Sequence, residues 1–92
     1  MIGHSRLSGD EISRRGREIY YSRLRSLVEV SDNIGKMIHI DIETGDYEIG
    51  DYMDVAAGLR LHAKHEGAAL YGHRIGYKTA VSLGGMMERE TR

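Results

Sequence analysis

Polar and apolar residues alternate most regularly between Gly35 and Gly50. The alternation covers residues 36–42 and residues 46–49, and Thr44-Gly45 stands between the two runs. Alternation with a period of two is typical of a strand with one buried face, and a glycine between two such runs favours a tight turn. This region therefore predicts a β-hairpin whose isoleucines face the core.

The segment before the hairpin carries a helical pattern. Ser8 and Glu11 fit a capping box, in which the serine hydroxyl accepts from an amide three residues on and the glutamate reaches back. Apolar residues then recur at spacings of three and four, as a helix with one buried side requires: Ile12, Ile19, Tyr20, Leu24, Leu27 and Val28. We expect this helix to end at Ser31-Asp32-Asn33.

A second helix is predicted over Tyr52–His65, with Asp51 as its N-cap and Gly67 in the left-handed position that follows a helix. Its expected inner side consists of Met53, Ala56, Ala57, Leu59, Arg60 and Ala63. Two further strands are expected over residues 69–74 and 77–83, joined by a tight turn at Ile75-Gly76.

The order of the predicted elements is αββαββ. It favours an α+β fold with a four-stranded, mostly antiparallel sheet and two helices packed on one face. We expect one domain over residues 8–85, between a flexible N-terminus at 1–7 and a flexible C-terminal tail at 86–92. The pattern leaves open whether the hairpins join one sheet within a chain or pair across a dimer.

The composition limits how this domain can build a core. The 92 residues include six tyrosines but no phenylalanine, tryptophan, cysteine or proline. Because the largest apolar side chains are missing, we expect a second copy of the chain to complete the core. The lack of cysteine excludes disulfides and thiolate metal sites. The sequence shows no signal peptide and no apolar run of about 18 residues, so we expect a cytoplasmic protein without a membrane span.

The net charge of −1 hides an uneven distribution. Residues 1–30 carry six arginines and four acids, residues 31–54 carry seven acids and one lysine, and residues 55–92 carry six basic residues and three acids. Such asymmetry favours self-association or a charged partner. Nucleic-acid binding is less favoured, because glutamates interrupt the arginines of the first helix and phosphate binding needs a net basic surface.

Five short motifs occur in order along the chain: IYY at 19–21, NIGK at 33–36, IDIETGDYEIG at 40–50, RIGY at 74–77 and GG at 84–85. Together they resemble a group of small bacterial proteins with no established activity, so the resemblance implies no catalytic residue or cofactor. Some of those proteins are encoded in two-gene units beside short protease-like or toxin-like proteins, which implies an interaction or antitoxin-like role. They tend to carry an acidic residue at the position of Tyr52.

Several polar residues are candidates for chemistry. His39 and Asp41 are two apart on one predicted strand and therefore point the same way, and Glu48 can lie across from them. Such a set could bind a divalent metal or perform acid–base chemistry, and the alternative is a solvated sheet face. His62 and His65, three apart near a helix end, form a weaker candidate metal pair.

A polar and aromatic cluster is expected at the second hairpin, formed by Tyr71, His73, Arg74 and Tyr77. Arginine and tyrosine are enriched at interfaces, so the cluster predicts a partner or anion contact; the alternative is an internal ion pair with packed tyrosines. The sequence favours a homodimeric interaction or regulatory module without a cofactor, which could also bind a protein encoded by a neighbouring gene. The alternatives are a metal-dependent or acid–base enzyme on the first hairpin and a nucleic-acid-binding regulator.

Overall fold

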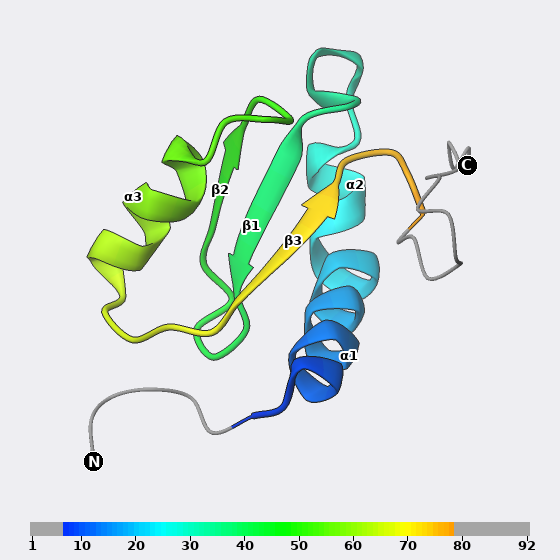
Figure 1. Ribbon diagram of the computed structural model, residues 1–92. Coiled ribbons are helices and arrows are strands. Elements are labelled where there is room, and N and C mark those ends of the chain that lie inside the picture. The colour runs from blue at the N-terminus through cyan, green and yellow to red at the C-terminus, as the bar shows by residue number, and fades with distance from the viewer. Residues whose placement is uncertain (1–6, 79–92) are drawn as a thin grey trace.

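The computed structural model describes residues 7–78, which form an α+β fold with helices on both sides of a three-stranded antiparallel sheet (Figure 1). The helical elements are α1 (Gly9–Ile19), the π-helical turn η1 (Tyr20–Leu24), α2 (Arg25–Val28), the 3-10 helix η2 (Ser31–Asn33) and α3 (Ala56–Lys64). The strands are β1 (Met37–Asp41), β2 (Tyr47–Gly50) and β3 (Leu70–Arg74), in the spatial order β2-β1-β3. No helix in this part of the chain has the length and apolar character to cross a membrane.

The first helix begins as predicted and runs without a break through α1, η1 and α2. The Ser8 hydroxyl oxygen accepts from the Glu11 amide at 3.1 Å, which satisfies one of the free N–H groups of the first turn. In η1 the Arg25 N–H donates to the Tyr20 carbonyl, five residues earlier, so this turn is wider than an α-helical turn. Gly35, with φ of +91°, then redirects the chain into β1.

The predicted first hairpin is confirmed. β1 is the central strand and runs antiparallel to both neighbours. Gly45, with φ of +82°, makes the turn into β2. On one face, each inward isoleucine of β1 has a neighbour on both sides: Ile38 lies between Ile49 and His73, and Ile40 lies between Tyr47 and Tyr71.

The apolar core lies between this sheet face and the first helix. Tyr20, Leu24 and Val28, four residues apart, are buried against Ile38 and Ile40. The core cluster also includes buried residues of the β1–β2 turn, the start of β3 and the loop after it: Ile42, Ala69, Tyr71 and Ile75. Leu7, just before the helix, packs against the same cluster.

The prediction that both helices pack on one face of the sheet is wrong, because α3 covers the opposite face (Figure 1). A Cβ added to Gly50 of β2 would lie 2.9 Å from the Ala57 Cβ, and one added to Gly58 of α3 would lie 3.3 Å from the His39 ring. His39 alternates with the inward isoleucines of β1 and therefore points away from the first helix. The prediction failed because polar residues on that side of the strand indicated a face exposed to solvent.

The second helix begins later than predicted. α3 starts at Ala56, whose amide donates to Asp54 Oδ1 at 2.8 Å, and not at Tyr52. Ala57 and Leu61 are its fully buried residues. The predicted inner side is therefore correct for Ala57, but it is wrong for four residues that the structure exposes: Met53, Leu59, Arg60 and Ala63.

The predicted third strand is confirmed as β3, and Gly76, with φ of +86°, makes the turn that follows it. Gly67 adopts the expected positive φ, +79°, between α3 and β3. The predicted fourth strand over 77–83 lies mostly outside the described residues, as do the tail at 86–92 and all but Leu7 of the predicted flexible N-terminus. These parts of the prediction stay expectations.

Candidate functional site

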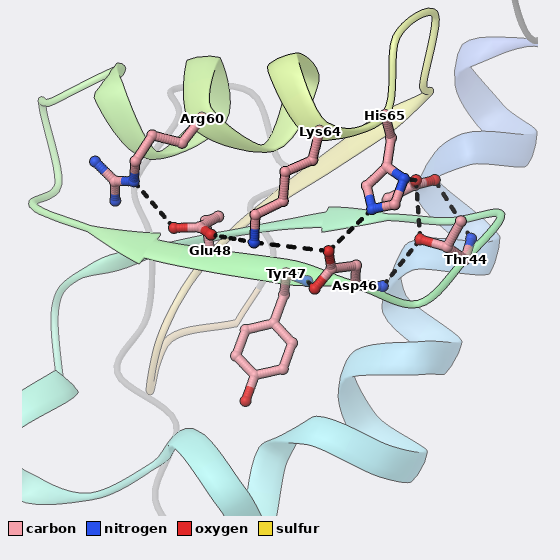
Figure 2. A network of polar contacts seen from close by, with 8 residues as sticks. Thr44, Asp46, Tyr47, Glu48, Arg60, Lys64 and His65 are labelled. Carbon is pink, nitrogen blue, oxygen red and sulfur yellow. Dashed lines mark hydrogen bonds and ion pairs between the residues drawn. The ribbon is translucent and has the colours of Figure 1, made fainter.

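A network of charged side chains joins α3 to β2 and to the turn before it (Figure 2). Glu48 of β2 accepts from Arg60 Nε at 3.0 Å and from Lys64 Nζ at 2.9 Å. Lys64, followed by Arg60, holds the pKa of Glu48 below its usual value. Glu48 in turn raises the pKa of Lys64. Cation and carboxylate thus stabilise each other's charged form and fasten one side of α3 to the edge strand.

His65 lies just after α3, between two carboxylates. Its Nε2 donates to Asp46 Oδ2 at 2.9 Å, and its Nδ1 lies 3.9 Å from Asp41 Oδ2. The hydrogen bond from His65, with a second from the Tyr47 amide, lowers the pKa of Asp46. Asp41 is buried and also accepts from the Thr44 hydroxyl at 2.9 Å. These contacts anchor the end of α3 to the β1–β2 turn.

His39, Asp41 and Glu48, predicted as a polar site on an exposed sheet face, do lie on one face, but α3 covers it. His39 Nε2 is buried without a hydrogen-bond partner in residues 7–78, and burial lowers the pKa of this histidine. Glu48 is bonded to α3, and Asp41 is bonded within its own turn. No hydrogen bond or ion pair between the three is found in the described range, so they do not form one catalytic constellation.

No group of three or more histidine and acidic side chains within residues 7–78 could hold a metal ion. Of the two predicted histidine ligands, His65 is bonded to Asp46 and His62 is exposed on α3. The described residues therefore offer no support for the metal-site alternative.

Half of the predicted partner cluster lies in the core. Tyr71 and His73 are buried, and the Tyr71 hydroxyl and His73 Nδ1 share a hydrogen bond of 2.8 Å. The His73 ring also stacks on Tyr20 with centroids 3.9 Å apart. The expectation that these two side chains lie on a binding surface needs correction, because β3 turns its odd-numbered side chains toward the first helix.

Arg74 points to the other side of β3, where two tyrosines enclose it. Its guanidinium carbon lies 4.2 Å from the centroid of the Tyr52 ring and 4.3 Å from that of Tyr77. Its Nε donates to the Gly35 carbonyl at 3.2 Å. Cation–π contacts with both rings hold the guanidinium in place. Tyr52, which the sequence analysis did not assign to this cluster, therefore belongs to it.

The structure also reveals an outer patch, defined as Tyr52, Met53, Val55 and Leu59. Their exposed fractions are 44%, 84%, 69% and 65%. The Leu59 amide donates to the Val55 carbonyl, so these two side chains lie one turn apart on the outer side of α3. This patch was not predicted, because the helical pattern placed Met53 and Leu59 on the inner side. A second apolar pair with the same four-residue spacing, Ala57 and Leu61, was the available signal that a different side of the helix is buried.

No protein-family model matches the chain, and neither a curated protein nor a solved structure does. The function is therefore inferred from the surfaces and contacts described above.

Proposed function

We propose that this protein is an association module that pairs with a second copy of itself through the outer patch. The observation that carries the proposal is that the outer side of α3 carries large apolar residues. Ala57 and Leu61 are buried against the sheet, while Val55, directly before the helix, and Leu59 lie exposed on the opposite side. A surface helix normally carries polar residues opposite its buried side, so apolar residues there favour a further contact.

The loop before α3 enlarges this apolar surface. Met53 is the most exposed of the large apolar residues described, and Tyr52 lies beside it in the chain. A cluster of exposed apolar residues differs from isolated ones, because it marks an interaction surface more often than chance exposure does. Methionine and tyrosine are also enriched at interfaces.

The charges around the outer patch favour a second copy as the partner. Asp51 and Asp54 are exposed directly beside Tyr52 and Met53, and Arg74 is held against the Tyr52 ring. A two-fold axis brings the same patch of two copies together. Because the patch carries both signs of charge at its edge, each acid can approach the cation of the other copy. A surface with only one sign of charge would repel its own copy.

The test is the oligomeric state of the full chain, measured by light scattering coupled to size-exclusion chromatography. We expect a dimer at micromolar concentration, and we expect Leu59→Glu to give a folded monomer because a charge is placed in the apolar contact. Leu27→Glu is the matched control, since Leu27 on α2 has the same exposed fraction of 65%. It should remain dimeric.

A wild-type chain that is monomeric at micromolar concentration would overturn the proposal. So would equal dissociation by Leu27→Glu and Leu59→Glu, because the effect would then not depend on the outer patch. Circular dichroism of each variant establishes that the fold is retained.

A further inference from the structure

Arg74 is fixed more firmly than a surface arginine normally is. Its guanidinium carbon is 4.2 Å and 4.3 Å from the centroids of two tyrosine rings, and its Nε donates to a backbone carbonyl. A free arginine side chain loses much rotamer freedom when it binds, and this loss reduces affinity. In Arg74 the rings of Tyr52 and Tyr77 and the Gly35 carbonyl have already imposed that order.

The fixed guanidinium has no acidic partner within residues 7–78, where no ion pair involves Arg74. The Nε hydrogen bond leaves the two terminal nitrogens of the fork available for a carboxylate. A carboxylate can take two parallel hydrogen bonds from such a fork, which gives more directional binding than a lysine provides. The arrangement is therefore suited to binding one carboxylate at the edge of the outer patch.

We propose that Arg74 is a carboxylate clamp that binds Asp51 of a second copy of the chain. This inference rests on the proposed function, because it names the polar contact that orients the dimer. Asp51 is exposed, immediately precedes Tyr52 of the clamp, and has no side-chain hydrogen bond or ion pair in the part of the chain that the structure describes. Asp54 is less suitable, since its Oδ1 already accepts from the Ala56 amide at the start of α3.

Two-fold symmetry gives this contact its specificity. When Arg74 of one copy meets Asp51 of the other, the reciprocal pair forms at the same time, so every dimer contains the contact twice. Both residues lie beside Tyr52, so the reciprocal contacts place the axis near Tyr52, and the exposed Met53 follows Tyr52 in the chain. The apolar residues then supply the buried area, and the two ion pairs set the orientation.

The experiment exchanges the charges of Arg74 and Asp51 by substitution and measures the dimer dissociation constant of each variant by sedimentation equilibrium. Arg74→Glu and Asp51→Arg should each raise the dimer dissociation constant at least about tenfold, because each brings two like-charged pairs together. The double variant Arg74→Glu/Asp51→Arg restores opposite charges and should recover most of the wild-type affinity. Glu43→Arg is the control: it makes the same charge change on the exposed β1–β2 turn, at the other end of β2 from Asp51, and should leave dimerisation unchanged.

The outcomes separate this inference from the proposed function. If Leu59→Glu breaks the dimer while both charge reversals leave its affinity intact, the clamp is overturned and the association module stands. If the single reversals weaken the dimer and the double variant does not recover, Asp51 is not the partner of Arg74 and the inference fails. A monomeric wild type overturns both. Recovery in the double variant also excludes misfolding as the cause of the single effects.

Discussion

The two faces of the sheet are held by different chemistry. On the face toward α1 and α2, large apolar side chains such as Tyr20, Leu24 and Ile40 are buried in one cluster. On the face toward α3, small residues allow close approach, Ala57 and Leu61 are buried, and charged contacts such as that between Glu48 and Lys64 lie at the exposed margin. Both faces exclude water, and the second adds ion pairs that respond to protonation and salt.

This difference assigns separate tasks to the two layers. Burial of apolar surface stabilises a fold under most solution conditions, whereas exposed ion pairs contribute little and are screened by salt. We therefore expect the first helix and the sheet to provide most of the stability. The α3 layer is attached less firmly and presents the outer patch. Stability and association are thus placed on opposite sides of one sheet.

The largest effect should come from the apolar face. Ile40→Ala removes a fully buried side chain between Tyr47 and Tyr71 and should lower the free energy of unfolding by about 2–5 kcal/mol. Urea denaturation followed by circular dichroism measures this loss. Leu27→Ala, at an exposed position of α2, should change stability by less than about 0.5 kcal/mol. Similar losses in the two variants would contradict the division between core and surface.

A smaller loss is expected from Gly16→Ala. A Cβ at this position would overlap the Tyr71 ring, so the helix or the strand must move, at a cost of about 1–3 kcal/mol. Alanine normally favours a helix over glycine, so a net loss would identify the clash as its cause. The control is Gly9→Ala, where an added Cβ meets nothing within 4 Å. If Gly16→Ala is as stable as wild type, the close contact between α1 and β3 is incorrect.

The charged face should respond to acid. Hydrogen bonds, the strongest from Lys64 and from His65 respectively, lower the pKa values of Glu48 and Asp46 from their ordinary values of 4.5 and 3.8. Groups with lowered pKa values stabilise the fold fully above those ordinary values, and the stabilisation is lost as the pH falls through the folded-state values. Glu48→Gln should therefore reduce the loss of stability below pH 4.5, measured as the midpoint of urea unfolding. Glu66→Gln, outside the network, should keep the wild-type acid profile.

The smallest effect should come from His39. Burial lowers its pKa below the ordinary value of 6.5, so the unfolded chain binds a proton there more readily than the folded chain. Stability should therefore fall as the pH drops below 6.5, and His39→Gln should remove this part of the decline. The comparison is the difference in unfolding midpoint between variant and wild type across this range. If the profiles of wild type and His39→Gln are parallel, the pKa of His39 is the same in the folded and unfolded states, and the prediction is wrong.

Local features of the fold could be predicted because each depends on a few neighbouring residues. The Ser8 cap, the alternation of Ile38 and Ile40, and the turn at Gly45 all follow from short-range rules. Short-range rules could not predict which side of α3 faces the sheet. Its two apolar pairs, Val55 with Leu59 and Ala57 with Leu61, have the same spacing and are two residues out of phase. Only contact with the sheet decides which pair is inside.

The candidate site could be predicted only in part, because its residues meet through contacts between elements that are distant in the sequence. Arg74 and Tyr77 were identified from residue types that favour interfaces, but Tyr52 joins them from a distant loop that no local pattern connects to β3. Tyr71 and His73 were misplaced because their polar atoms favour a surface position. A hydrogen bond between the two side chains removes that preference and allows both to be buried.

The wide turn η1 has a consequence for how the chain tolerates insertions and deletions. An ordinary α-helix advances about 100° per residue, so residues spaced by four drift around the axis by about 40° at each step. The five-residue ring from Tyr20 to Arg25 takes up some of that drift, which keeps Tyr20, Leu24 and Val28 aligned on the sheet. Removing one residue here, for example the exposed Ser22, would turn η1 into an ordinary α-helical turn and bring Tyr20, Leu24 and Val28 to spacings of three and four residues, which also share one helix face. This turn can therefore lose a residue without exposing Val28.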